Sequence, residues 1–149
     1  MLTKKAKYAL KALAHLANYR PGDSVGVRDI AIAENIPKKF LDTILCELRT
    51  AGFVESKMGK HGGYTLARPA TDISVGDVVR VIDGTLAPIS CASRSRFRAC
   101  DDCRDPEHCA TRLIMLDAKI ALAKVLDNFN IAGMRAVSAA ADGPFMWHI

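Results

Sequence analysis

The fold is decided by the stretch Phe53-Val54-Glu55-Ser56-Lys57-Met58-Gly59-Lys60-His61-Gly62-Gly63-Tyr64-Thr65-Leu66-Ala67. Residues 53–56 and 64–67 each predict a short strand. The basic, glycine-containing residues 57–63 between them predict a hairpin tip, because paired glycines supply positive φ. A tight turn that needs Gly62-Gly63 for its geometry alone is the other interpretation of this tip.

Three helices are predicted before the hairpin, over residues 3–19, 27–34 and 37–50. The first has Thr3 as its N-cap, and the third has Pro37 in its first turn, where a missing N–H is tolerated. The predicted buried stripe of the third helix is Phe40, Leu41, Ile44, Leu45 and Leu48. Three helices followed by a basic hairpin predict a winged helix-turn-helix over residues 1–68, in a mostly α protein with one small β-hairpin.

The positive charge of the chain is concentrated in its first half. The net charge is +5. Residues 1–65 hold 11 Lys and Arg against 6 Asp and Glu, whereas the remainder of the chain is balanced at 10 of each. This asymmetry indicates a polyanionic partner for the first half, although a solvated basic face is an equally ordinary explanation of charge alone.

Double-stranded DNA is the polyanion that a winged helix binds. The second helix of a helix-turn-helix reads bases in the major groove through its N-terminal residues, here Lys38, Lys39, Asp42 and Thr43. Phosphate contacts are assigned to Lys4, Lys5, Arg28, Lys57 and Lys60, because such contacts carry affinity without sequence information. An exposed helix end is the plainer interpretation of Lys38 and Lys39.

Four of the five cysteines lie close together, at Cys91, Cys100, Cys103 and Cys109, in a polar segment rich in Arg and Asp. A buried cysteine needs apolar neighbours, and this segment predicts none. Clustered thiols on a solvated loop indicate an iron–sulfur cluster, a zinc ion or a thiol–disulfide switch. Spare cysteines without a function are the fourth explanation. Cys46, inside the third helix, is interpreted as packing or as an incidental surface thiol.

The remaining elements frame these cysteines. A helix is predicted over 73–82, with Ser74 as N-cap and Asp77 three residues later, and Asp83-Gly84 ends it. Residues 72–109 are therefore a connecting helix and a cysteine loop. A long helix is predicted over 110–128, and residues 131–149 are interpreted as an Ala-rich and Gly-rich tail.

Several classes of function are disfavoured. The chain shows no signal peptide and no apolar run near the roughly 20 residues that span a bilayer, so we expect a cytoplasmic protein without a membrane partner. The Cys100-x-x-Cys103 spacing is that of a dithiol oxidoreductase, but such a motif normally opens a helix. We expect no enzyme, and we hold an oxidoreductase or an electron carrier as unlikely alternatives.

Several motifs together resemble those of a known family. They are the start Leu2-Thr3-Lys4-Lys5-Ala6-Lys7-Tyr8-Ala9-Leu10, the wing His61-Gly62-Gly63-Tyr64, and Ile73-Ser74-Val75-Gly76-Asp77-Val78-Val79. With a cysteine loop before a long helix, the chain resembles the Rrf-two family of bacterial regulators, typified by IscR, NsrR and RirA. The resemblance adds Thr3, Tyr8, Phe40, His61, Gly62, Gly63 and Tyr64 to the expected DNA-binding residues.

The resemblance implies a homodimeric transcription regulator that pairs through the helix at 110–130. It also implies an iron–sulfur cluster, of the 4Fe–4S or 2Fe–2S type, that controls DNA affinity in response to iron, oxidants or nitric oxide. Its expected ligands are Cys91, Cys103 and Cys109, with Cys100 as an additional thiol and zinc as the alternative metal.

The chain departs from the family pattern at three positions. Arg112 replaces a histidine of IscR-like members, Tyr8 stands near an acidic ligand of NsrR-like members, and Met58 replaces an arginine of the wing.

Overall fold

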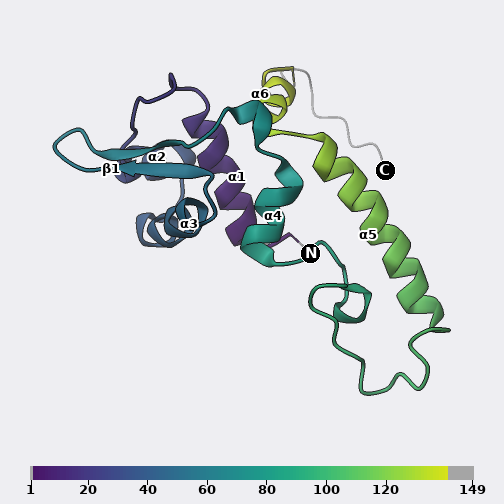
Figure 1. Ribbon diagram of the computed structural model, residues 1–149. Coiled ribbons are helices and arrows are strands. Elements are labelled where there is room, and N and C mark those ends of the chain that lie inside the picture. Colours follow the sequence, from purple (N-terminus) through teal and green to yellow (C-terminus); the bar gives the residue numbers. More distant parts are fainter. Residues whose placement is uncertain (1, 141–149) are drawn as a thin grey trace.

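The computed structural model describes residues 2–140; residue 1 and residues 141–149 lie outside the described part, and with them the second half of the predicted tail. The fold is mostly helical with one two-stranded antiparallel sheet, as predicted (Figure 1). The elements are α1 (Lys4–Leu16), α2 (Val27–Glu34), α3 (Lys38–Thr50), β1 (Val54–Lys57), β2 (Gly63–Leu66), η1 (Ala70–Asp72), α4 (Val75–Asp83), η2 (Ser90–Ala92), α5 (Ala110–Asn128) and α6 (Ile131–Ala140).

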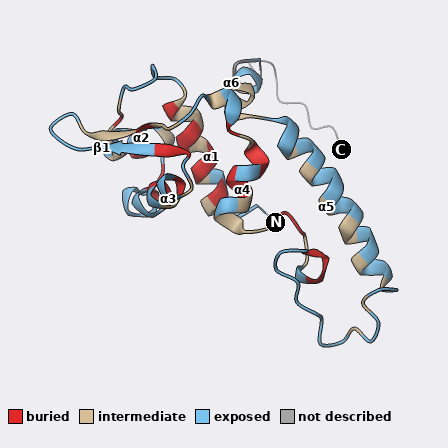
Figure 2. Cartoon of the chain, viewed as in Figure 1, coloured by how far each residue is buried: buried red, intermediate tan, exposed pale blue. Residues whose placement is uncertain are grey.

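Helix α1 lies at the centre of the molecule and contacts α2, α3, α4 and α6. Its first turn is capped by Thr3, whose hydroxyl accepts a hydrogen bond from the amide of Ala6 at 3.2 Å. Every one of these helices contributes buried residues around it, and Figure 2 colours the buried parts of the chain red. The apolar periodicity of the sequence therefore produces a single core, and the helix-turn-helix rests on it.

The turn between α2 and α3 has the geometry of a helix-turn-helix. Asn35 adopts the left-handed conformation, with φ of 51°, and ends α2. Ile36 is buried beneath the turn and Pro37 precedes the first residue of α3. Asn tolerates positive φ better than most residues, so the sequence allows the sharp change of direction here.

The hairpin is held to the body by a third segment. Strands β1 and β2 pair in the register Val54↔Leu66 to Lys57↔Gly63. Val25 and Tyr64 exchange two backbone hydrogen bonds of 2.9 Å. A Cβ at Gly63 would collide with the carbonyl of Val25, so this close approach explains the glycine as part of the base of the wing.

Helix α4 connects the winged helix to α5. Ser74 caps it by accepting from the amide of Asp77 at 3.3 Å, as predicted, and Gly84 ends it with φ of 82°. Arg80 forms two hydrogen bonds of 2.8 Å with the carboxylate of Asp127 on α5. Gly76 leaves room for that carboxylate, because a Cβ there would collide with it.

The C-terminal part differs from the prediction in one element. Residues 131–140, which the sequence indicated only as part of an Ala-rich and Gly-rich tail, form helix α6, and Ile131 is fully buried in the core. Ala has the highest helix propensity, and the buried Ile131 explains why the Ala-rich segment docks as a helix. Helix α5, by contrast, has no fully buried residue in this single chain (Figure 2).

Candidate functional site

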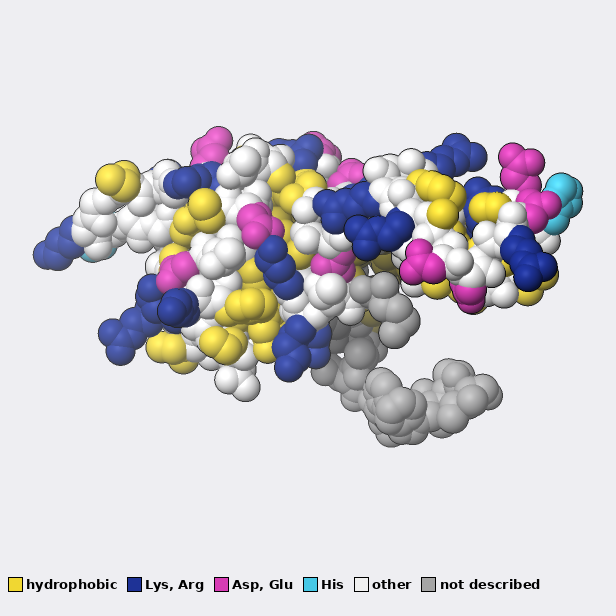
Figure 3. Space-filling model, turned by 90° about the horizontal axis from the view of Figure 1, so that it is seen from below, with side chains coloured by type: hydrophobic (Ala, Val, Ile, Leu, Met, Phe, Trp, Pro, Cys, Tyr) yellow, Lys and Arg dark blue, Asp and Glu magenta, His cyan; other side chains and the backbone are white. Residues whose placement is uncertain are grey.

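Helix α3 exposes a polar face. Its exposed residues near the N-terminus include Lys38, Lys39, Asp42 and Thr43, the four predicted to read bases. Lys38 forms an ion pair of 2.9 Å with Asp42, one helical turn later. Seen from below, this side of the molecule carries Lys and Arg side chains from the hairpin end to the cysteine-loop end (Figure 3).

Phe40 corrects the predicted buried stripe of α3. The other four members of the stripe are fully buried, whereas Phe40 is 41% exposed. Its ring packs edge-on against Tyr8 of α1, with 5.8 Å between the ring centroids. Phe40 therefore lies at the edge of the buried face of α3. The two aromatic rings form a partly exposed pair between α1 and α3.

The start of α1 is tied to the end of α4. The amide of Thr3 donates to Asp83 Oδ2 at 2.9 Å, and the Thr3 hydroxyl donates to Oδ1 at 2.5 Å. Lys4 is exposed beside this contact, while Lys5 forms an ion pair of 2.6 Å with Glu47 of α3. Asp83 had no assigned role from the sequence, and only the fold brings it to Thr3, 80 residues away.

The residues of the wing that were predicted to contact DNA differ in their orientation. Lys60, His61 and the 97% exposed Met58 lie at the solvated tip. Lys57 is turned back and donates to the carbonyl of Gly22, so its charge is held against the loop between α1 and α2. Arg28, the predicted contact on α2, is exposed.

The four clustered cysteines line one cavity. Its volume is about 460 Å³, and its walls include Cys91, Cys100, Cys103 and Cys109. Cys91 comes from η2 and Cys109 is the N-cap residue of α5. The fold thus brings together all four residues that the sequence singled out, at the lower end of α5 and away from the wing (Figure 1).

Cys91 corrects the expectation that none of these thiols has apolar neighbours. It is only 5% exposed, and Ala92 beside it in η2 is also buried. Cys100 is exposed, and Cys103 and Cys109 are half-buried. The segment is therefore buried at its first cysteine and more accessible to solvent at the others.

The thiols lie in two interacting pairs. The pKa of the Cys100 thiol is raised, chiefly by its hydrogen bond with the Cys91 thiol. Desolvation and then a hydrogen bond with Cys109 raise the pKa of Cys103. The pKa of Cys109 is lowered, first by the backbone N–H of Arg112 and also by that of Thr111. The free N–H groups at the start of α5 thus favour a thiolate at Cys109.

Arg112 joins the two ends of the cysteine loop. Its Nε donates to the carbonyl of Cys91 at 2.9 Å, and its Nη1 donates to the carbonyl of Pro106 at 3.0 Å. From the sequence, Arg112 was noted only because IscR-like members have a histidine at this position. Within residues 2–140, no three His, Cys, Asp or Glu side chains are arranged to hold a single metal ion.

His108 and Cys46 lie outside the thiol cavity. His108 pairs with Asp105 at 2.7 Å on the surface of the loop. Cys46 is exposed on α3, which supports its interpretation as a surface thiol.

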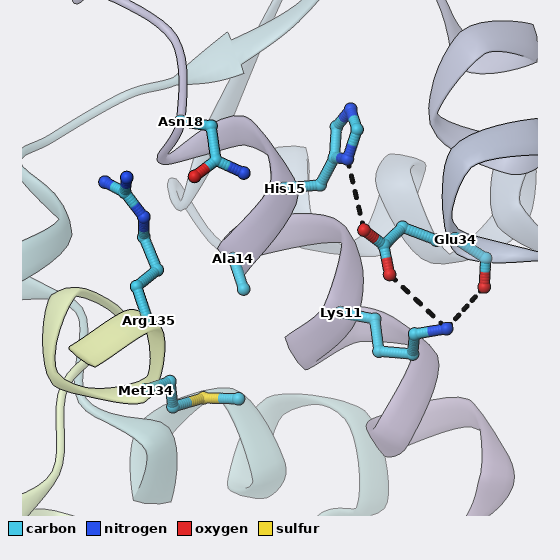
Figure 4. A pocket seen from close by; sticks show the side chains of 7 residues that line it. All are labelled: Lys11, Ala14, His15, Asn18, Glu34, Met134 and Arg135. Atoms are coloured by element: carbon cyan, nitrogen blue, oxygen red, sulfur yellow. Dashed lines mark hydrogen bonds and ion pairs between the residues drawn. The ribbon is translucent and has the colours of Figure 1, made fainter. Parts of the chain in front are cut away.

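A second hollow, of about 510 Å³, lies between α1, the end of α2 and α6 (Figure 4). Its charges neutralise one another, because Glu34 accepts from His15 at 3.1 Å and pairs with Lys11 at 3.3 Å. On the opposite side, Arg135 donates to the carbonyl of Ala17 at 2.7 Å. The polar residues of this hollow therefore hold α2 and α6 against α1.

None of the helices in the described part of the chain has the length and apolar character to cross a membrane.

Known proteins match this chain over nearly its whole length. The model of the Rrf2 family, described as iron-dependent transcriptional regulators, matches residues 2–136. An rrf2-like putative HTH-type transcriptional regulator of Rhodobacter capsulatus is 40% identical over 95% of this chain and 96% of its own length.

Two solved structures are also similar. CymR, the global cysteine regulator of B. subtilis, has a TM-score of 0.74 at 26% identity, covering 92% of this chain and 97% of its own. IscR of T. potens has the same TM-score and identity, covering 98% and 93%. These relatives are regulators rather than enzymes, so the family match and the winged helix lead to one conclusion: the chain is a DNA-binding transcriptional regulator of the Rrf2 family.

Proposed function

We propose that the chain is a homodimeric regulator whose affinity for operator DNA is set by an iron–sulfur cluster on the cysteine loop, residues 91–109. The observation that carries this proposal is the single cavity lined by four cysteines. The description of the family as iron-dependent and the likeness to IscR support it.

The donor set suits a cluster better than a single zinc ion. Thiolates are the usual ligands of iron–sulfur clusters, and Cys91, Cys103, Cys109 and Cys100 supply four. A zinc ion needs its ligands about 2.3 Å from one centre, and the described residues offer no such group. A cluster extends over several metal atoms, so thiols grouped in two pairs around a cavity fit it more readily.

The loop is joined mechanically to the DNA-binding unit. When bound, the cluster would supply iron–thiolate bonds that form or break with iron supply or oxidation. The segment that leads from α4 to the loop begins at Gly84, directly after Asp83, whose carboxylate holds Thr3 at the start of α1. Arg80, one turn earlier, holds Asp127 of α5. Movement of the loop would therefore reach α1 and α5 together, with a typical coupling of about 1–3 kcal/mol, or roughly 5–150-fold in affinity.

The DNA contacts are proposed on the face that carries α3. Lys39 and Thr43 would reach base edges from the start of α3, and Lys38 and Asp42 would first have to separate. Lys4 and Lys60 would contact phosphates on either side of the groove. Since Met58 occupies the wing tip, Lys60 supplies the positive charge there, and Lys57 would first have to leave the carbonyl of Gly22.

The second copy of the chain is proposed to cover α5. Ile114, Ala118, Ala121 and Val125 are all exposed and follow one another at spacings of four, three and four residues. This is the spacing of a coiled-coil seam, and the two alanines permit close approach. Two copies paired through α5 would place two α3 helices on one duplex.

The cluster is tested with protein purified without oxygen. Its visible absorption and Mössbauer spectra are expected to show a cluster, and Cys103→Ala and Cys109→Ala should abolish the signal. Cys46→Ala is the matched control, because this thiol is exposed and outside the loop. Unchanged spectra in both loop variants would remove these residues as ligands.

The switch is tested by DNA binding before and after anaerobic removal of the metal, on an operator selected by the protein from a random pool. We expect the affinities of the two forms for this operator to differ by roughly 5–150-fold. Equal affinities would end the proposal of a cluster switch.

A thiol–disulfide switch is the second candidate, because the thiols of Cys103 and Cys109 already interact and CymR is a cysteine regulator. Hydrogen peroxide would take two electrons from the two thiols, giving one disulfide and two waters. Mass spectrometry of metal-free protein after peroxide treatment would detect the bond. If peroxide changes DNA affinity without metal, this candidate replaces the cluster.

A further inference from the structure

Four arginines of the cysteine loop and Arg112 of α5 divide into two groups. Arg104 and Arg112 line the thiol cavity. The other three, Arg94, Arg96 and Arg98, are outside its lining and exposed. We call residues 94–98 the arginine arm.

The arginine arm contains no acidic residue, and the nearest in sequence are Asp83 and Asp101. Residues 84–100 contain no Asp or Glu, and the acidic residues of the loop begin only at Asp101. None of the ion pairs formed within residues 2–140 includes an arginine of the arm. Three unneutralised guanidinium groups on one short segment attract a polyanion rather than a single carboxylate.

The arm is fastened to the end of α4. The amide of Arg96 donates to the hydroxyl of Ser93 at 3.0 Å, and Ser93 is only 3% exposed. The Ser93 hydroxyl also lies 3.2 Å from that of Thr85. The guanidinium of Arg96 packs on Gly84, where a Cβ would collide with it. Arg96 thus anchors the arm, and Arg94 and Arg98 flank the anchor.

This attachment joins the arm to the start of α1. Gly84 follows Asp83, whose carboxylate binds the amide and hydroxyl of Thr3. The exposed Lys4 comes directly after Thr3. The face in Figure 3 carries Lys and Arg side chains from the hairpin end, across the body, to the cysteine-loop end.

We propose that the arginine arm is an additional contact for the DNA backbone, beyond the winged helix and next to the start of α1. It binds phosphates and therefore adds affinity without sequence preference. The proposal rests on DNA lying along α1 and α3, and it holds whether or not the loop carries a cluster. Because the arm lies between Cys91 and Cys100, any ligand that fixes both thiols also fixes both ends of the arm.

The test removes the two flanking charges and measures the salt dependence of binding. The full-length double variant Arg94→Gln/Arg98→Gln is compared with the wild type on a duplex of mixed sequence. Each lost phosphate contact lowers the slope of log affinity against log salt by about 0.9, so a decrease of about 1.8 per protomer is expected. Lys119→Gln/Lys124→Gln on α5 removes the same net charge and should leave the slope unchanged.

Two further variants distinguish binding from folding. Arg94→Lys/Arg98→Lys keeps both charges and should keep the slope, whereas an equal loss in this variant would mean a structural role and overturn the proposal. An unchanged slope in the glutamine variant would also overturn the proposal. If that variant instead lost binding to an acidic protein, the partner of the arm would be that protein and not DNA.

Lys39→Ala reports separately on the proposed α3 interface. Unchanged operator affinity in Lys39→Ala combined with a reduced slope in the arm variant would place the error in the winged-helix assignment and not in the arm.

Discussion

Arg112 illustrates how one side chain can organise a loop. Its guanidinium spans the carbonyls of Cys91 and Pro106, which belong to opposite ends of the cysteine segment. A planar fork with several N–H groups can serve two acceptors at once, whereas an ammonium group is a point charge on a flexible stem. We therefore regard Arg112 as a positioning residue for the thiols.

Substitution of Arg112 should loosen the site without removing a ligand. In Arg112→Lys and Arg112→Ala, we expect cluster uptake to persist and cluster loss to become several-fold faster, since the two loop ends are no longer joined. The decay of visible absorbance in the presence of a chelator measures this rate. Arg104→Ala, which alters another wall of the same cavity, is the control; equal decay in all variants would contradict the role of Arg112.

Cys91 has a structural role that its partners lack. It is 5% exposed, whereas Cys100 is exposed. Cys91→Ser should lower the free energy of unfolding of the metal-free protein by about 1–3 kcal/mol, because it places a more polar hydroxyl in a buried position. Cys100→Ser should change it by less than about 0.5 kcal/mol. Denaturant unfolding of both variants measures the difference, and equal stabilities would contradict the burial of Cys91.

At the scale of elements, α4 is the connecting piece. It touches α1 through Asp83, α5 through Arg80, and the loop through Gly84. None of these contacts is local in sequence. A short helix with three such attachments can pass a displacement of the loop to both the DNA-binding unit and the dimer helix.

The ion pair between α4 and α5 predicts an acid-dependent stability. Arg80 holds the pKa of the Asp127 carboxyl below its ordinary value, first through their hydrogen bonds. A lowered pKa in the folded state stabilises the fold above the unfolded-state pKa of about 3.9, and this contribution is lost as pH falls through the folded-state pKa. Both side chains are well exposed, at 38% and 43%, so we expect about 1 kcal/mol or less.

Asp127→Asn tests this assignment. Its deficit in free energy of unfolding, relative to the wild type, should be constant near neutral pH and should disappear in strong acid. Urea unfolding over a pH series measures the deficit. A deficit that persists unchanged below pH 2 would mean that packing, and not the charge, is responsible.

The start of α3 predicts how DNA is read. Lys39→Ala should weaken binding to the selected operator by about 1–3 kcal/mol if the ammonium contacts a base. Fluorescence anisotropy on operator and mixed-sequence DNA measures both affinities. An equal loss on the two duplexes would show that Lys39 contacts only phosphate.

At the scale of the whole molecule, α5 is incomplete in a single chain. It is long, has no fully buried residue, and exposes Ile114 at 63% and Val125 at 55%. An apolar seam of this length in water indicates a partner helix. We propose a second copy of the chain as this partner, because a two-fold axis would bring the same residues of the seam together.

Ile114→Glu/Val125→Glu should therefore give a monomer, because four carboxylates would meet at the seam. Sedimentation velocity measures the mass, and operator affinity should fall strongly since one winged helix reads only half a site. Lys124→Glu, on the flank of the seam, is the control and should remain dimeric. A double variant that stays dimeric would assign the interface elsewhere.

The winged helix was predictable because its signals are local. Thr3, Pro37, Ser74 and Gly84 mark the ends of helices through capping and backbone geometry, which act within a few residues. Apolar spacing then defines the buried faces. Helix α6 over residues 131–140 was harder to predict, because the Ala-rich segment docks as a helix through the burial of Ile131 in the core.

The sequence by itself determined the class of fold, the basic first half and the cysteines that line the cavity, since these follow from residue types and short spacings. Only the tertiary structure decided that Cys91 is buried, that Phe40 lies at the surface and that Arg112 joins the loop ends. The tertiary structure also decided that Asp83 binds Thr3, 80 residues away in the chain. Such contacts join residues far apart in the chain, and no local pattern records which distant side chains the packed core brings together.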